Sequence, residues 1–371
     1  MARKKITYII SHVHKSFAFE WIAKGLENDY EFYFILLNPA GSYFEQFLID
    51  EHFAFKRINY RNKFDFPLAL LKVFFILLFK RPDIVHVHLL DAQLIGLTAA
   101  KLAGIRKRIY TRHTSNFHHA YSPSGIKYDR WSNLLATKII SISQATDRTL
   151  IDIEKVLPKK IVKIPHGFDW KYFNNISIDR IEKVRSFWKI QNKSIVIGVI
   201  ARHIEWKGIQ YIIPAFREFL SKHPDSVLIL ANAGGPYHET ILEMIMDLPA
   251  GKIIMIPFEE DVAALYRVFD MYVHTPIDSI CEAFGQTYVE ALALDIPSIF
   301  TLSGIAAEFI KNHENALIVP FKDSLAISDS LARIYADSEL RSKLIENGKR
   351  DVISRFGIDA MLGSLKMVYD E

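Results

Sequence analysis

The chain reads RVFDMYVHTPIDSICEAFGQTYVEALALDIPSIFTLSGIAAEFIKNHENALIVP between residues 267 and 320, where two short apolar runs flank a helical pattern. Residues 271–274 predict a buried strand, 284–294 have helical spacing, and 298–302 predict a second strand. This order indicates a parallel α/β sheet, in which the loop 275–282 opens at the carboxyl end of a strand. Because ligands bind at that edge of open α/β sheets, we expect the functional site in this segment.

A glycine, Gly285, stands at the start of the predicted helix. Glycine has no Cβ, so the backbone can approach a ligand closely there. The first amides of a helix have no partner within the helix and carry a partial positive charge. An anion such as a phosphate group would fit this position.

Two carboxylates, Glu282 and Glu290, bracket this glycine. On a helix, eight residue steps make about 2.2 turns and roughly 12 Å of rise, so the two side chains would lie near opposite ends of an elongated ligand. The alternative is structural. Glu282 would then cap the helix, favoured by the helix dipole, and Glu290 would lie on a solvated face.

The residues around the two glutamates form a dense pattern, E-x-F-G-x4-E-A-x-A-x3-P, followed by a glycine and a further glutamate. The pattern resembles the signature of the retaining, nucleotide-sugar-dependent glycosyltransferases of the GT-B fold, in the family called family 4 or glycosyl transferases group 1. The matching residues are Glu282, Phe284, Gly285, Glu290, Ala291, Ala293, Pro297, Gly304 and Glu308. The chain departs from the family at Ser303-Gly304-Ile305, where a Gly-Gly pair is usual, and at Leu294-Asp295, where a glycine commonly follows the helix.

The resemblance implies an α/β chain of the GT-B fold, with two Rossmann-like, doubly wound domains facing across a cleft. We expect an N-terminal acceptor-side domain over residues 1–168, a linker over 169–193, and a nucleotide-sugar-binding domain over 194–352. A C-terminal helix in the segment 353–371 is expected to cross back to the first domain.

A second motif lies in the loop after the predicted strand 194–200 and reads ARHIEWKG over residues 201–208. It resembles the family's G-R-x4-K-G, whose arginine and lysine hold the donor diphosphate, and only the leading glycine is replaced. The resemblance assigns Arg202 and Lys207 to the diphosphate, together with Gly285. Two cations at a strand end would neutralise two phosphate charges.

The resemblance also implies roles at the two ends of the donor. Glu282 is expected to hold the sugar hydroxyls as a catalytic residue, and Glu290 to hold the ribose hydroxyls. The base is expected near Phe258, which would either stack on it or pack within the domain, and near Gly234 in the glycine turn AGGP. The resemblance implies no metal, and the chain contains no Asp-x-Asp motif, so no cofactor is expected besides the nucleotide-sugar substrate.

The first domain alternates predicted strands with helices, and the strands fall at 5–10, 31–36, 84–88, 108–111, 138–142 and 162–164. No glycine occurs between Ile10 and Gly25, so the G-x-G-x-x-G fingerprint of dehydrogenases is absent. The stretch SHVHKSF replaces the family's glycine-rich first loop. The role of its His12, His14 and Lys15 stays open between the phosphates, the acceptor and solvent.

A further catalytic candidate lies in the first domain. The stretch RIYTRHT resembles the family's strand-end T-x-H, whose histidine approaches the donor sugar and phosphate, and it contains His113. Asp91 follows the neighbouring strand and would line the acceptor side.

The composition is that of a soluble globular protein, with 50% hydrophobic and 24% charged residues among 371. This length suits two domains. Cys281 is the only cysteine, which excludes an intrachain disulfide, and the spacings of a structural zinc site are absent. The opening MARKKITYIISHVHK has too short an apolar run for a signal peptide or a spanning helix, and it predicts a first strand.

The two halves of the chain differ in charge. Residues 1–170 contain 25 Lys and Arg against 15 Asp and Glu (+10), and residues 171–371 contain 21 against 27 (−6). A basic half indicates an anionic partner. No zinc finger or RNA-binding motif is present, so we expect an anionic membrane surface and no nucleic acid. The apolar run 67–81 is too short to span a bilayer, and it is either a core helix or a helix resting on a membrane.

The expected function is transfer of a sugar, with retention, from a nucleotide-diphosphate sugar to a glycan or lipid-linked acceptor in cell-envelope polysaccharide or glycolipid synthesis. The alternatives are a sugar-nucleotide epimerase of the same fold and an inactive GT-B partner subunit. The expected location is the cytoplasm, at the inner face of the membrane if the apolar helix rests there. The donor nucleotide, the sugar, the acceptor and the oligomeric state are left open.

Overall fold

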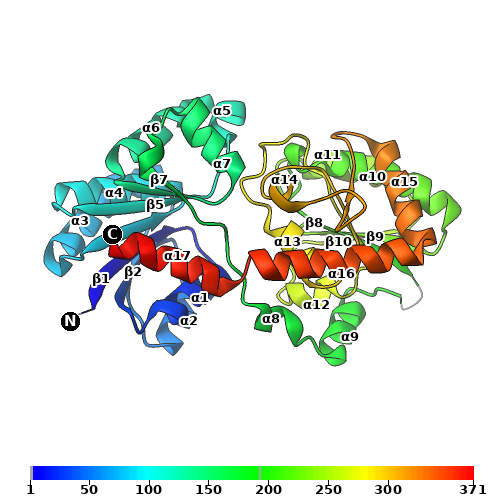
Figure 1. The fold of residues 1–371 in the computed structure, drawn as a ribbon, viewed down its shortest axis with the longest axis horizontal. Helices are drawn as coiled ribbons and strands as arrows, with labels where there is room; N and C mark the ends of the chain where they lie inside the picture. Colours follow the sequence, from blue (N-terminus) through cyan, green and yellow to red (C-terminus); the bar gives the residue numbers. More distant parts are fainter. Residues whose placement is uncertain (1–2, 192–193) are drawn as a thin grey trace. The chain divides into compact units, whose positions relative to one another are not determined.

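A computed structural model describes residues 3–191 and 194–371 and divides the chain into two compact units. The first unit comprises Met1–Phe168 together with Ile358–Glu371, and the second comprises Asp169–Gly357. Each unit contains a parallel sheet flanked by helices (Figure 1).

The described part of the first unit contains a seven-stranded sheet in the order β3-β2-β1-β4-β5-β6-β7, with every neighbouring pair parallel. The strands are β1 Lys4–Ser11, β2 Tyr30–Asn38, β3 Ala54–Asn59, β4 Ile84–His88, β5 Lys107–Arg112, β6 Lys138–Ser141 and β7 Ile161–Lys163. The helices are α1 Phe17–Leu26, α2 Tyr43–Asp50, α3 Phe66–Lys80, α4 Leu90–Leu102, α5 Phe117–Tyr121, α6 Ile126–Leu135, α7 Gln144–Arg148 and α17 Ile358–Asp370. The strand order reverses between β1 and β4, as in a doubly wound sheet.

Apolar layers pack on both faces of this sheet. Successive residues of a strand point to opposite faces. Accordingly Ile6, Tyr8 and Ile10 belong to one apolar cluster, and Ile9 belongs to the other. The first cluster includes residues of α1 and α17, among them Leu365, so the C-terminal helix forms part of the first unit's core.

The described part of the second unit contains a six-stranded parallel sheet in the order β10-β9-β8-β11-β12-β13. The strands are β8 Ile195–Ile200, β9 Ser226–Ala231, β10 Ile253–Ile256, β11 Met271–His274, β12 Ser298–Phe300 and β13 Leu317–Ile318. The helices are α8 Trp170–Asn174, α9 Ile178–Phe187, α10 Ile209–Lys222, α11 His238–Ile245, α12 Val262–Tyr266, α13 Gln286–Ala293, α14 Ala306–Phe309, α15 Ser324–Ala336 and α16 Ser338–Arg355. The order reverses between β8 and β11, so the loops after these two strands flank the switch point.

The structure differs from the sequence expectation at several elements. The segment 169–191, expected as most of the linker, groups with the second unit and carries α8 and α9, and residues 192 and 193 lie outside the described residues. The helix expected from residue 284 begins at Gln286, because Gly285 adopts a left-handed conformation with φ +82°. The edge strands β3 and β13 were not predicted. In β3 only Ile58 is fully buried, which removes the apolar signal.

The packing of α17 predicts a specific loss of stability. Leu365→Ala removes a buried side chain from the first apolar cluster, and such changes cost about 2–5 kcal/mol. We expect the thermal unfolding midpoint to fall by roughly 5–15 °C, measured by circular dichroism. Met367→Ala is the matched control, because Met367 lies on the same helix and is exposed. Equal midpoints for the two variants would contradict the placement of α17.

Candidate active site

The loop after β8 is held against the end of β11 by a glycine. Gly208 has φ +76°, and a Cβ placed on it would lie 1.9 Å from the carbonyl oxygen of Thr275, the residue that follows β11. Only glycine allows this approach. The approach places Lys207, the last residue of a short 3-10 turn (Glu205–Lys207), beside the loop that contains Glu282.

Glu282 is a buried carboxylate with two partners. Lys207 Nζ donates a hydrogen bond to Glu282 Oε1, and His274 Nε2 lies 3.2 Å from the same oxygen. Burial raises the pKa of Glu282, but the charge of Lys207 and the contact with His274 outweigh it and lower the pKa to about 2. The carboxylate is therefore ionised at neutral pH. Burial lowers the pKa of His274 despite this neighbour, so the imidazole is neutral and donates from Nε2.

Two turns fix the backbone around this carboxylate. The amide of Glu282 donates to Ser303 Oγ at 3.2 Å, and the amide of Ile305 donates to the carbonyl of Phe284 at 2.9 Å. A Cβ on Gly304, which has φ +57°, would lie 2.7 Å from that carbonyl oxygen. Ser303 stands where the family has a glycine, and its hydroxyl makes a contact that glycine lacks.

The helix α13 begins directly beyond this carboxylate. Gly285 precedes it in the left-handed region, and the amides of Gln286 and Thr287 form its first turn. The first amides of a helix have no partner within the helix, so they are available to an anion.

Glu290, in the middle of α13, has a different environment. Tyr266 Oη donates to Glu290 Oε2 at 2.9 Å. Burial raises the pKa of Glu290 to about 7, and the hydrogen bond from Tyr266 opposes this only in part. The carboxyl group therefore titrates at neutral pH, and hydroxyl groups that donate to it would favour its ionised form.

Three further candidates follow the ends of neighbouring strands. Arg202 follows β8 and is exposed, without a side-chain partner in the described part of the chain. Gly234 follows β9 and faces open space, and its carbonyl accepts from the amide of His203 at 2.9 Å. Phe258 follows β10 and is 60% exposed, so it is not packed within the unit. Since the strands are parallel, these residues share one edge of the sheet with Glu282.

His113 belongs to the first unit, at the end of β5. Its Nε2 lies 3.0 Å from His88 Nδ1, and its ring stacks on His166 with the ring planes 12° apart. Burial, reinforced by the neighbouring His166, lowers the pKa of His113 to about 3, so this imidazole is neutral.

The side chains of the first loop, which contains His12, His14 and Lys15, contact other residues of this unit. His12 Nε2 lies 3.0 Å from Asp91 Oδ2, while His14 packs edge-on against Tyr43. Lys15 Nζ lies 4.9 Å from the centre of the Phe17 ring.

Two protein-family models match the chain: Glycosyltransferase Family 4 over residues 12–171 and Glycosyl transferases group 1 over residues 180–351. The capsular polysaccharide biosynthesis glycosyltransferase CapM of Staphylococcus aureus is 25% identical over 312 residues, which are 81% of this chain and 80% of that protein. The chain belongs to the group 1 glycosyltransferases.

Two other proteins resemble this glycosyltransferase over most of its length. The UDP-Gal:alpha-D-GlcNAc-diphosphoundecaprenol alpha-1,3-galactosyltransferase of Escherichia coli is 21% identical over 308 residues, covering 81% of this chain and 78% of that one. The structure of Anabaena HepE in complex with UDP and glucose superposes with a TM-score of 0.86 at 20% identity, over 100% of both chains. The fold of the glycosyltransferase is GT-B.

Sequence reasoning missed several side chains of this site. His274, Tyr266 and Ser303 contact the two glutamates, but they lie within apolar runs or at a departure from the family motif. His203 was also missed. It is fully buried inside the ARHIEWKG loop, and its Nδ1 lies 2.8 Å from His238 Nδ1. Among these residues, only His274 had a signal in the sequence that could have indicated a role, because it is a polar residue at the end of an apolar strand.

A cluster of possible metal ligands in the glycosyltransferase already holds a cation. Ligand atoms of His119, Asp129 and Glu154 lie within 4.8 Å of one another. The guanidinium of Arg112, almost fully buried, donates to Asp129 at 2.5 Å and to Glu154 at 2.7 Å. A metal ion would have to displace Arg112, so the cluster is an ion-pair network. In the described ranges, none of the helices combines the length and the hydropathy that crossing a membrane requires.

The pairing of Lys207 with Glu282 predicts a stability effect. Lys207→Ala would leave a buried carboxylate without its cation, and unpaired buried charges destabilise by a few kcal/mol. We expect the thermal midpoint at pH 7 to fall by about 5 °C or more. The double variant Lys207→Ala/Glu282→Gln should recover most of this loss, because a neutral amide needs no cation.

The ion pair between Lys207 and Glu282 also predicts how the stability of the fold depends on pH. The folded pKa of Glu282 lies below its ordinary value of 4.5, so its stabilising contribution is present above that pH and is lost as the pH falls toward 2. The difference in thermal midpoint between wild type and Lys207→Ala should therefore be smaller near pH 4, because Glu282 of the variant takes up a proton there. Scanning fluorimetry at pH 7 and pH 4 measures both effects. An unchanged midpoint for Lys207→Ala at pH 7 would show that the pair does not stabilise the loop.

Proposed function

We propose that the glycosyltransferase transfers a sugar, with retention of anomeric configuration, from a nucleoside-diphosphate sugar to a glycan or lipid-linked acceptor. The observation that carries this is the ionised Glu282, paired with Lys207 at the mouth of α13. Two relatives support this proposal: the Escherichia coli enzyme uses UDP-Gal and a diphosphoundecaprenol-linked acceptor, and HepE is seen with UDP and glucose.

The donor diphosphate is proposed to lie between the loop after β8 and the start of α13. Arg202 is an exposed cation with no ion-pair partner in the described ranges, and Lys207 shares its charge with Glu282. Lys207 and the amides after Gly285 are held in place and are preorganised donors, and Arg202 would add a further positive charge. Negative charge develops on the departing diphosphate in the transition state, and such donors stabilise it without reorganisation. This arrangement supplies positive charge without a metal, so no metal cofactor is proposed.

The remaining candidates are assigned to the two ends of the donor. Glu282, ionised and acceptor-only, would accept hydrogen bonds from the sugar hydroxyls, while Glu290 would accept from the ribose hydroxyls. Phe258, exposed beside the same sheet edge, would stack on the base, and the open space at Gly234 would admit the nucleoside. His113 is assigned to the sugar and phosphate on the strength of the T-x-H resemblance.

The proposed setting is cell-envelope polysaccharide or glycolipid synthesis at the inner face of the membrane. The capsular polysaccharide function in the name of the Staphylococcus aureus relative supports the pathway class. The direct test is incubation with UDP-, GDP- and ADP-sugars, followed by NMR of the anomeric configuration of the product. A product with inverted configuration would overturn retention, and release of an isomeric nucleotide sugar without acceptor would favour an epimerase.

Arg202 gives the cleanest test of the diphosphate site. Arg202→Ala should weaken UDP or GDP binding by at least about ten-fold, because a charge-assisted contact to phosphate is lost. The thermal midpoint should not change, because an exposed, unpaired cation contributes little to stability. Isothermal titration calorimetry measures the affinity. Arg217→Ala is the matched control, since Arg217 is exposed in the same unit and pairs with Asp247 on the surface. Unchanged affinity in Arg202→Ala would reject the assignment.

Substitution of each glutamate in turn tests whether the two carboxylates have different roles. Glu290→Gln should weaken free nucleoside diphosphate, whereas Glu282→Gln should spare it and impair sugar transfer. Wild-type affinity should rise between pH 6 and pH 8, because below its pKa of about 7 Glu290 must lose a proton before it accepts ribose hydroxyls. The phosphate titrates as well, so the measured quantity is the wild-type slope minus the slope of Glu290→Gln. Equal slopes, or equal losses from both variants, would show that the roles are misassigned.

A further inference from the structure

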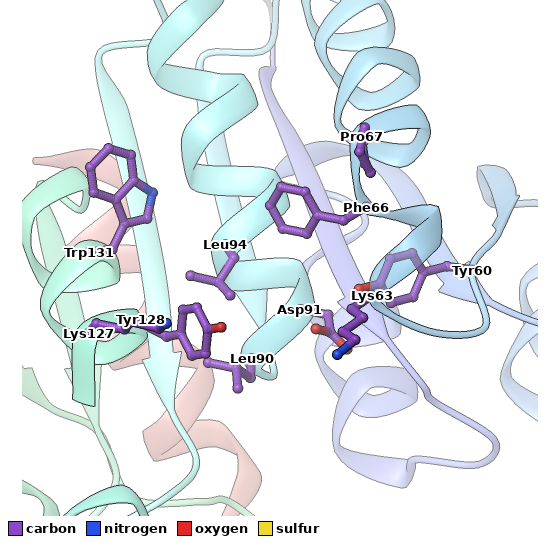
Figure 2. Close-up of a pocket in the computed structure, with 10 residues that line it drawn as sticks. All are labelled: Tyr60, Lys63, Phe66, Pro67, Leu90, Asp91, Leu94, Lys127, Tyr128 and Trp131. Carbon is purple, nitrogen blue, oxygen red and sulfur yellow. The ribbon is translucent and has the colours of Figure 1, made fainter. Parts of the chain in front are cut away.

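The first unit contains a cavity of about 740 Å³ that the donor site does not use. It lies between the start of α3 and the start of α6, with the first turns of α4 forming its floor (Figure 2). Phe66, Leu94 and Leu90 line the floor and one wall, and Tyr128 and Trp131 line the other. A long hydrocarbon group would fit these apolar surfaces.

Two cations stand at this apolar cavity. Lys63 comes from the turn before α3 and Lys127 from α6, on opposite sides of the cavity in Figure 2. Both are exposed, and neither has an ion-pair partner within residues 3–191 or 194–371. The third charged residue, Asp91, is already held by His12 at 3.0 Å. The two lysines outnumber this carboxylate, so the net charge of the cavity lining is positive, which is complementary to a phosphate.

The outer surface of α3 extends this apolar character away from the cavity. Ala69, Val73 and Leu77, spaced four residues apart, are fully buried. Phe66, Leu70, Phe74 and Ile76 are partly buried against the same apolar cluster, so the helix packs on the unit by one face. The large apolar side chains exposed on the helix are Leu68, Leu71, Phe75, Leu78 and Phe79. The helix is thus not a core helix buried on both sides, and a patch of this kind marks an interaction surface.

Cations surround the exposed face of α3. Lys72, Lys80 and Arg81 are exposed on the helix or at its end. An apolar helix face with basic neighbours suits the surface of an anionic bilayer, where each basic group contributes about 1 kcal/mol.

We infer that this cavity receives the phosphate-bearing end of a lipid-linked acceptor, with the phosphate between Lys63 and Lys127 and the hydrocarbon chain directed along α3 toward the bilayer. The inference rests on the proposed function, because it names the acceptor class of the same reaction. A free glycan would present hydroxyl groups to walls that are mostly apolar. A phosphate joined to a hydrocarbon satisfies both the two cations and the walls.

The test uses the full chain and three soluble probes: farnesyl phosphate, farnesol and inorganic phosphate, each below its aggregation concentration. We expect farnesyl phosphate to bind at least ten-fold more tightly than either of the others, measured by isothermal titration calorimetry. Equal binding of inorganic phosphate would identify a simple anion site, and equal binding of farnesol would identify an apolar pocket. Either result overturns the inference.

Two double variants distinguish an effect of the cavity lysines from an effect of net charge. They are Lys63→Glu/Lys127→Glu, at the cavity, and Lys101→Glu/Lys159→Glu, away from it. Both change the net charge of the first unit by the same amount, and all four lysines are exposed, so folding is not at risk. The first variant should weaken farnesyl phosphate at least ten-fold, and the second should leave it unchanged. Equal losses would assign the effect to net charge and reject the cavity.

Vesicles of phosphatidylglycerol distinguish the acceptor cavity from the bilayer surface. Leu71→Ser/Phe75→Ser should reduce co-sedimentation with these vesicles and leave farnesyl phosphate binding intact, because both residues lie outside the cavity lining. Loss of farnesyl phosphate binding in this variant would place the lipid on α3 and not in the cavity.

UDP titration of the same preparations keeps the two proposals separate. If UDP binds and farnesyl phosphate does not, the cavity inference fails while the donor site stands. If farnesyl phosphate binds and no nucleoside diphosphate does, the proposed donor chemistry fails while the cavity stands.

Discussion

The contact on which the candidate active site depends is the one between Lys207 and the buried carboxylate of Glu282. A carboxylate that is 7% exposed stays ionised only if a cation and hydrogen-bond donors compensate for lost hydration. Lys207 reaches it because Gly208 packs against the carbonyl of Thr275, and the turn through Ser303 and Gly304 holds the backbone of Glu282 in place. Gly208 and Gly304 hold the loops that surround the carboxylate of Glu282. Substitutions at either glycine should therefore change the pKa of Glu282 as well as the local backbone.

Two glutamates eight positions apart have opposite electrostatic environments. A cation lowers the pKa of Glu282 to about 2, while burial with a single tyrosine partner raises that of Glu290 to about 7. A permanently charged acceptor suits the end of the donor where bonds break, because it does not compete for a proton. An acceptor that ionises when hydroxyl groups approach suits a binding role, and in the proposed role at the ribose it would link nucleotide affinity to pH.

Sequence alone predicted the residues that follow strand ends, since apolar runs locate the strands and motifs locate the loops. Glu282, Lys207 and Gly285 do lie together at one sheet edge. The partners of the carboxylate could not be predicted, because His274 and Ser303 meet it only through the pairing of β11 with β12 and the turn beyond. The orientation of α3 could not be predicted from the sequence either. A helix that is apolar all round has no pattern to indicate its buried stripe.

Part of the positive charge of the first half is neutralised within the folded unit. Arg112 is buried and neutralised by Asp129 and Glu154, and Arg57 is paired with Glu45, so these cations attract no partner from solution. The exposed cations of this unit without an ion pair in the described chain include those around α3 and the adjacent cavity: Lys56, Arg61, Lys63, Lys72, Lys80, Arg81 and Lys127. Fields from such a cluster act over about 8 Å at physiological salt. Around α3 these cations lie beside five exposed large apolar side chains, Leu68, Leu71, Phe75, Leu78 and Phe79. This combination suits a helix that rests on an anionic bilayer better than a site for a soluble anion, which needs no apolar surface.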